Sequence, residues 1–182
     1  IAGRRAELVI ATKTPARDKA TALQHLDLSL KRLNTDYIDL WQLHNVARMD
    51  QVEQIFGPGG AIEALTQARD QGMVRFLGVT GHADPDVLME ALRRFPFDTI
   101  LMALNAADRH RLSFVERLLP MAVERQMGII GMKIPARSRI LSTWTPPPPE
   151  QQPEFGRATR PGTITMREAM YFTLSHPVST VI

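Results

Sequence analysis

Tyr37-Ile38-Asp39-Leu40-Trp41-Gln42-Leu43-His44 is the stretch of sequence that decides how the chain folds. The run is mostly apolar, aromatic and branched, and its length is that of one buried β-strand. It ends abruptly in a histidine, followed by Asn45. Buried strands that deliver a titratable side chain at their C-terminal ends build the active sites of α/β barrels and open α/β sheets. A lone histidine there is more often a core residue bonded to the backbone, so the interpretation depends on the neighbouring strands.

The composition is that of an ordinary soluble globular protein. Of the 182 residues, 44% are hydrophobic and 23% are charged, and the formal net charge is +3. There are no cysteines, which excludes disulfides and thiolate metal sites. Basic residues are scattered and no apolar run approaches the ~18 residues of a membrane span, so we expect neither a nucleic acid nor a membrane as partner. No signal peptide is recognisable and the chain begins at Ile1, so we expect a cytoplasmic protein whose native N-terminus lies upstream.

Similar apolar runs recur along the chain and predict six strands, at residues 8–13, 37–44, 74–80, 97–104, 127–134 and 178–182. Between them, apolar residues at helical spacing predict helices that reach residue 33 from a cap at Thr14 or Asp18, and that span residues 61–71, 85–95, 110–126 and 165–175. Thr165 and Glu168 have the spacing of a capping box. Pro120 predicts a break within the fourth helix, because a proline removes one helical hydrogen bond. Residues 46–60 and 142–162 are predicted as loops, the second an extended excursion around a proline run.

The alternation of strands and helices predicts a parallel α/β sheet buried on both faces, within one domain over residues 1–182. Five of the predicted strands end in or beside a polar residue, namely Lys13, His44, Thr80, Asn105 and Lys133. Parallel strands place all of these ends at one edge of the sheet. Any one of them is compatible with a solvated strand end, but the set together favours an active site of the barrel type.

Two motifs carry a resemblance to a known family. They are Leu8-Val9-Ile10-Ala11-Thr12-Lys13 and the run of residues 33–44 that ends at His44. With further matches at residues 72–80 and 174–182, the chain resembles the aldo/keto reductase family over nearly its whole length, and most of all a less characterised bacterial branch. The resemblance implies a (β/α)8 TIM-type barrel that binds NADPH. The six predicted strands would be its third to eighth, and the chain would be incomplete at both ends.

The resemblance also implies roles for two residues. The family's catalytic tetrad is Asp, Tyr, Lys and His, and the matching motifs make Lys13 its lysine and His44 its histidine. The Asp and Tyr belong on a strand that precedes Lys13 and is not in this sequence. In that reading an aldehyde or ketone is reduced to an alcohol by hydride transfer. Lys13 lowers the phenol pKa, ordinarily ~10, of the missing tyrosine acid, and His44 orients the carbonyl.

The positions that would bind the nicotinamide depart from the family pattern. Thr80-Gly81 stands where the family usually has Ser-Asn, so the hydroxyl is kept and the amide side chain is lost. An apolar residue near Leu101 replaces a glutamine, and Met132 or Lys133 replaces an aromatic residue that stacks on the ring. A methionine can also pack against a ring face. With Asn105, the candidate cofactor residues are Thr80, Gly81, Asn105, Met132 and Lys133.

Three other functions compete with an NADPH-dependent carbonyl reductase. One is a Schiff-base lyase that uses Lys133, whose apolar neighbours would desolvate its amine. Another is a non-catalytic binding or regulatory protein that keeps the barrel. The least favoured is a metal hydrolase that uses His44 and His82, because no carboxylate-rich set accompanies them.

Overall fold

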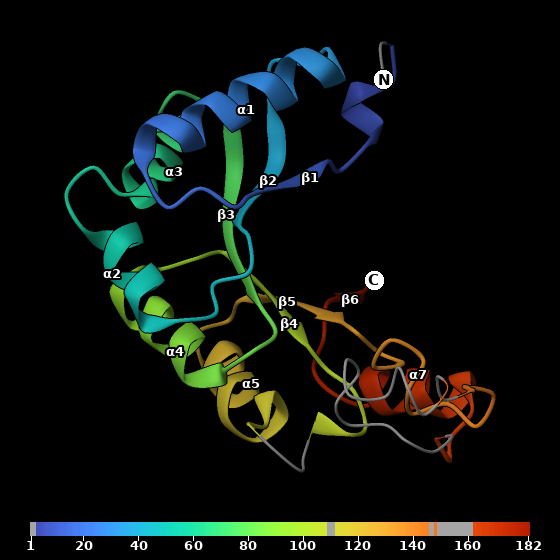
Figure 1. Ribbon diagram of the computed structural model, residues 1–182. Coiled ribbons are helices and arrows are strands. Elements are labelled where there is room, and N and C mark those ends of the chain that lie inside the picture. The colour runs from blue at the N-terminus through green and yellow to red at the C-terminus, as the bar shows by residue number, and fades with distance from the viewer. Residues whose placement is uncertain (1–2, 109–111, 146–147, 149–161) are drawn as a thin grey trace.

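A curved sheet of parallel strands forms the centre of the computed structural model, which describes residues 3–108, 112–145, 148 and 162–182 (Figure 1). Each strand pairs in parallel with the next one along the chain. The strands are β1 (Ala11–Thr14), β2 (Ile38–Leu43), β3 (Val74–Gly81), β4 (Thr99–Ala103), β5 (Gly128–Met132) and β6 (Thr180–Val181). This sequential order confirms the predicted parallel sheet, and it is the order in which the βα units of an α/β barrel follow one another.

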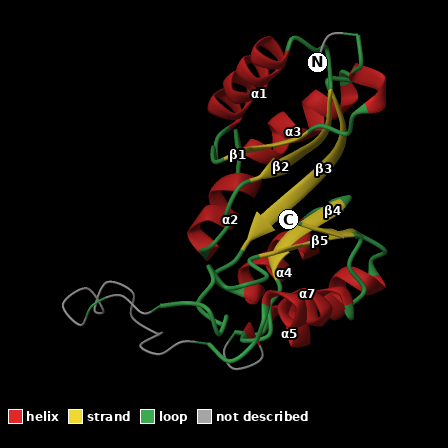
Figure 2. Ribbon diagram, turned by 90° about the vertical axis from the view of Figure 1, so that its right-hand side faces the viewer, coloured by secondary structure: helices red, strands yellow, loops and turns green. Residues whose placement is uncertain are grey.

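Helices cover the outer, convex side of this sheet (Figures 1 and 2). They are α1 (Lys19–Leu33), α2 (Met49–Phe56), α3 (Ala61–Asp70), α4 (Pro85–Arg94), α5 (Phe114–Glu124) and α7 (Met166–Leu174). A short 3-10 helix, η1 (Arg5–Glu7), precedes β1 and buries none of its residues. Of the two cap candidates for α1, Asp18 is the cap, since its carboxylate accepts from the Thr21 N–H. The predicted capping box of α7 is confirmed, formed by Thr165 and Glu168. None of the helices in the described ranges is long and apolar enough to cross a membrane.

The prediction of a loop over residues 46–60 was wrong, because this segment contains α2. Val52 and Ile55 lie one helical turn apart and are both fully buried, so burial of this short apolar face stabilises the helix. The glycines that suggested a loop are confined to the connection after it. Gly59 has a φ of +72°, and a side chain on Gly60 would collide with the carbonyl oxygen of Ile55.

The predicted break at Pro120 was also wrong, because α5 runs through it as one helix. Phe114 and Leu118 before the proline, and Ala122 after it, are all buried on the same side. Pro120 itself is exposed, so the carbonyl that loses its helical partner lies on the solvent side, where water can bond to it. The first residues of the helix predicted at 110–126, and most of the proline-rich excursion at 142–162, lie outside the described residues.

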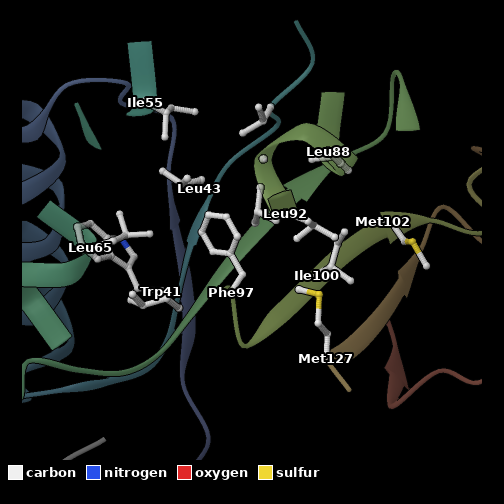
Figure 3. Close-up of a cluster of buried hydrophobic side chains, with 14 of the residues drawn as sticks. Trp41, Leu43, Ile55, Leu65, Leu88, Leu92, Phe97, Ile100, Met102 and Met127 are labelled. Carbon is white, nitrogen blue, oxygen red and sulfur yellow. The ribbon is translucent and has the colours of Figure 1, made fainter. Parts of the chain in front are cut away.

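The hydrophobic core lies between the outer face of the sheet and the helices (Figure 3). Side chains alternate between the two faces of a strand, so every second residue points outward. On β2 these residues include Trp41 and Leu43, and both are fully buried. Their neighbours on the next strands and on the helices complete the core, including Leu77, Val79, Ile100, Met102, Leu65, Leu88 and Leu92. This packing holds the strands together and leaves their other face to the inside of the curve.

Candidate functional site at the C-terminal ends of the strands

The inner face of the sheet carries polar side chains in successive layers. The register aligns Lys13 with Gln42, Gln42 with Gly78, and Gly78 with Thr99, so these four positions form one layer. His44 and Thr80 each follow by two residues and therefore lie on the same face, one step nearer the C-terminal ends. The structure thus brings the predicted lysine and histidine together on the inner face.

His44 directly follows β2 and is still tied to the neighbouring strand. Its backbone N–H donates to the Thr14 carbonyl over 2.8 Å, which extends the β1–β2 pairing by one residue. The side chain is exposed at the rim. Its pKa lies below the ordinary value, first because of partial burial and then because of the positive charges of Lys13, Arg17 and His82. A histidine with a lowered pKa is neutral near pH 7, so it can donate a hydrogen bond from one ring nitrogen without carrying charge.

A tight turn at Asn45 presents His44. Asn45 has a φ of +52°, in the left-handed region that few residues other than glycine adopt. Nη2 of Arg17 donates to the carbonyls of both His44 (2.9 Å) and Asn45 (3.0 Å). On the other side of the turn, the Asn45 N–H donates to Thr80 Oγ1 over 2.8 Å. The turn is therefore held from two directions, by the loop after β1 and by β3.

Positive charge gathers around this edge. The pKa of His82, just past β3, is lowered by partial burial and then by Lys133, with a smaller effect of Arg137. Together with the charges that act on His44, this defines a cationic rim, in which Lys13, Arg17, Lys133 and Arg137 surround His44 and His82. The charged neighbours that shift the two histidines are all basic, and such a surface attracts an anionic ligand.

The remaining predicted residues occupy distinct places on this edge. Thr80 is 1% exposed and its hydroxyl oxygen is engaged by the turn. Gly81 ends β3 where a Cβ would lie 2.7 Å from the Val46 carbonyl oxygen, so only glycine fits without a shift. Met132 is buried on the inner face, in register with Ala103, and Lys133 follows it with a φ of +62°.

Asn105 lies to one side of this group. With His82, Ala103 and Asp108 it lines a cavity of about 220 Å³, beside the ends of β3 and β4. Its side-chain oxygen accepts from the Ala107 N–H over 3.1 Å, so part of its hydrogen-bonding capacity is used locally. The Asp108 pKa is raised by burial, although the Val115 N–H and the Ser113 hydroxyl oppose that effect.

Sequence reasoning missed two residues of the site, Gln42 and Arg17. Gln42 is 1% exposed in the layer of Lys13, and its Nε2 has no hydrogen-bond partner among the described residues. The side chains of Gln42 and Thr99 approach each other above Gly78, where a Cβ would collide with both. The alternation of strand residues was the available signal for Gln42, since it stands two residues before His44. No motif pointed to Arg17.

Within the described ranges, no cluster of three His, Cys, Asp or Glu side chains is placed to hold a metal ion.

Comparison with known proteins was made by sequence and by structure. The family model of the aldo/keto reductase family matches residues 1–168. An uncharacterized oxidoreductase of Bacillus subtilis, YqkF, is 29% identical over 143 residues, which cover 72% of this chain and 43% of that protein. The L-galactose dehydrogenase of Arabidopsis thaliana is 29% identical over 123 residues, or 67% of this chain and 37% of its own length. The chain therefore spans less than half of each of these relatives.

The solved structures agree with the sequence matches. The holo form of the aldo-keto reductase AKR11C1 from Bacillus halodurans superimposes with a TM-score of 0.69 at 26% identity, over 98% of this chain and 63% of that one. The glycerol dehydrogenase AKR11B4 from Gluconobacter oxydans has a TM-score of 0.67 at 18% identity, which is evidence for the fold alone. The curved parallel sheet is thus part of a (β/α)8 barrel, as predicted from the sequence.

Proposed function

Because this chain belongs to the aldo/keto reductase family, we propose that its protein is an oxidoreductase that reduces an aldehyde or ketone to an alcohol with NADPH. The proposal rests on one observation above all. Lys13 and His44 lie on the inner face of adjacent strands, in successive layers, and the charge of Lys13 acts on the imidazole of His44. These are the residues that the family resemblance marks as catalytic.

The cofactor proposal is supported by the residues at the strand ends. A pyridine dinucleotide carries negative phosphates, and the cationic rim supplies complementary charge without an acidic group among the neighbours that shift its histidines. The site also contains buried polar atoms that have no protein partner in the described part of the chain, including Asn45 Oδ1 and Gln42 Nε2. Buried groups of this kind normally have a partner. Thr80, Gly81, Asn105, Met132 and Lys133 are proposed to contribute to cofactor binding.

The proposed chemistry divides between the two residues. NADPH, when bound, supplies the hydride that attacks the carbonyl carbon. As charge develops on the carbonyl oxygen, His44 donates a hydrogen bond from a neutral ring nitrogen and so stabilises it. The proposed role of Lys13 is to place an ammonium beside the acid that protonates that oxygen, which the family resemblance identifies as a tyrosine outside this sequence. A nearby cation favours the ionised form of a phenol and lowers its pKa, which matches the acid better to neutral pH.

Substitution of Lys13 by methionine tests the proposal in the intact gene product. Lys13→Met is expected to abolish NADPH oxidation with benzaldehyde or glyceraldehyde and to leave the circular dichroism spectrum and thermal midpoint unchanged, because the side chain is exposed. Lys31→Met is the matched control, since Lys31 is an exposed residue of α1 that pairs with Asp27 away from the strand ends. It should retain wild-type activity.

Two results would contradict the proposal. Retained activity in Lys13→Met would remove the lysine from the mechanism. Absence of NADPH binding by the wild-type protein, measured by calorimetry, would instead favour a non-catalytic barrel. Borohydride treatment in the presence of the aldehydes adds a further check, because a covalent adduct at Lys133 would indicate a Schiff-base enzyme.

A further inference from the structure

We propose that Arg17 is a positioning residue, whose guanidinium fixes the turn at His44 and Asn45 and thereby aims the imidazole at the substrate carbonyl. This inference rests on the proposed function. Arg17 lies in the loop between β1 and α1, four residues after Lys13. It contacts no part of the imidazole ring in the described interactions and acts through the backbone of the turn.

The hydrogen bonds of the turn show what holds it in place. Asn45 has a left-handed φ, which asparagine adopts more readily than other residues with a side chain, so the position of the turn depends on its contacts rather than on backbone strain. Arg17 Nη2 bonds the two successive carbonyls, and Thr80 accepts from the Asn45 N–H between them. The Val46 N–H also donates to the Thr80 carbonyl over 2.8 Å. Without Arg17, the N–H groups of the turn would still be held by Thr14 and Thr80, but the His44 and Asn45 carbonyls would lose their described partner.

Arg17 is itself fixed by the loop around it. Its carbonyl accepts from the Ala61 N–H over 2.8 Å, at the start of α3. Two of its guanidinium nitrogens, Nε and Nη1, are buried with no partner among the described residues. Burial, and to a lesser degree the charge of Arg48, lowers the Arg17 pKa. A buried cation is costly unless it is paired, so its retention points to a specific use.

No nearby carboxylate pairs with the Arg17 guanidinium in the described part of the chain. Asp18, the next residue, caps α1 by accepting from the Thr21 N–H. Glu53, which lines the same surface cavity as Arg17, pairs with Arg94 instead. The described hydrogen bonds of the guanidinium run only to the carbonyls of the turn that carries His44.

A test must separate the position of the turn from the charge of the arginine. The groups that act on His44 are Lys13 from β1, Arg17 from the following loop and His82 from the end of β3. Arg17→Lys keeps the charge but replaces the planar guanidinium, whose Nη2 donates to both carbonyls, by an ammonium of different reach and geometry. Arg17→Met loses both the charge and the guanidinium. Arg48→Met is the control, because Arg48 is a cation whose charge acts on Arg17, but it pairs with exposed Asp50 and has no described contact with the turn.

The experiment uses the intact gene product and two independent readouts. The first is kcat and KM for benzaldehyde reduction. The second is nuclear magnetic resonance of the carbonyl carbons of His44 and Asn45 and of the His44 ring, assigned with a His44→Gln variant. In Arg17→Met we expect kcat to fall by about 100-fold, the loss that a small misplacement of a catalytic group produces. The carbonyl resonances should move, and the His44 pKa should rise because a nearby positive charge is gone.

Arg17→Lys should show a smaller loss of kcat, displaced carbonyl resonances and a His44 pKa close to wild type. Arg48→Met should resemble the wild type in every readout. Unchanged kcat and resonances in the two Arg17 variants of an active enzyme would overturn the inference alone, and Arg17→Lys decides the matter if Arg17→Met does not fold. A wild-type protein that reduces no carbonyl, but whose resonances respond to Arg17, would overturn the proposed function while confirming that Arg17 holds the turn.

Discussion

The two faces of the central sheet are built from alternate residues of the same strands, yet their contents differ. The outer face of β2 carries Trp41 and Leu43, which are fully buried against helices in one continuous core. The inner face of the same strand carries the apolar Leu40, but toward its C-terminal end it carries Gln42 and is followed by His44. This face includes buried polar atoms that have no partner in the described ranges. The comparison separates the residues that stabilise the fold from those that are placed for chemistry.

This difference has an energetic meaning. Apolar burial contributes roughly 25 cal/mol per Å² of surface removed from water, so the outer face supplies most of the stability. Buried polar groups without partners destabilise the folded chain, and they persist at positions where function requires them. Substitutions on the two faces should therefore change different properties of the protein.

The largest expected effect on stability is on the outer face. Trp41→Ala should lower the free energy of unfolding by about 3–5 kcal/mol, the range for removal of a large aromatic residue from a core. Phe76→Ala is the matched change on the inner face, since Phe76 is in register with Leu40 and is 46% exposed. It should cost about 1–2 kcal/mol, because only about half of the side chain's surface is buried. Urea denaturation of the two variants measures both values, and equal losses would contradict the division between the faces.

A second prediction concerns the buried carboxylate of Asp39, near the start of β2. Its side chain is 4% exposed and accepts from Arg5 (2.7 Å), Arg75 (2.8 Å) and the Ile10 N–H (2.9 Å). Burial by itself would raise the Asp39 pKa, but the Ile10, Arg5 and Arg75 hydrogen bonds outweigh it and hold the pKa below its ordinary value. Asp39→Asn should destabilise the protein by about 2 kcal/mol, less than a fully buried pair costs, because Arg75 stays half exposed.

The pH dependence of this variant has a definite sign. A carboxylate whose pKa is lowered by folding adds stability above its unfolded pKa of ~3.9, and that stability is lost as the pH falls through the lower folded value. The gap in unfolding free energy between wild type and Asp39→Asn should therefore be constant from pH 7 to about pH 5 and shrink below about pH 4. A gap that widened on acidification would show that the paired carboxylate does not act as described.

The sequence predicted the outer face better than the inner one. Apolar runs located every strand of the described sheet, and local hydrogen-bonding rules predicted the Thr165 cap and limited the α1 cap to Thr14 or Asp18. The α2 helix was not predicted, because the glycine-rich run at Gly57–Gly60 indicated a loop and the apolar face before it is short. That face consists of Val52 and Ile55. Arg17 was not predictable, because its partners are backbone carbonyls 27 and 28 residues away, and no local pattern encodes such a contact.

A smaller effect on stability is expected where the inner face supports the turn. Thr80→Val should cost about 1–2 kcal/mol, because the buried hydroxyl that accepts from the Asn45 N–H is replaced by a methyl group of similar size. Thr80→Ser keeps the acceptor and should lose much less. Thermal unfolding of the pair measures the contribution of this hydrogen bond. Equal stability of the valine and serine variants would show that the Asn45 N–H does not depend on Thr80.

The smallest expected change in the free energy of unfolding gives the clearest contrast between the two faces. Thr99 Oγ1 is buried on the inner face beside Gln42 and has no described partner. Thr99→Val removes a desolvated hydroxyl and leaves the shape nearly unchanged, so the free energy of unfolding should stay constant or rise by up to about 1 kcal/mol. Val79→Thr is the reverse change in the outer core, where Val79 is fully buried, and it should be destabilising because the new hydroxyl enters an apolar cluster. A clear loss of stability in Thr99→Val would mean that its hydroxyl is bonded in solution, and the inner face would then be a satisfied polar layer.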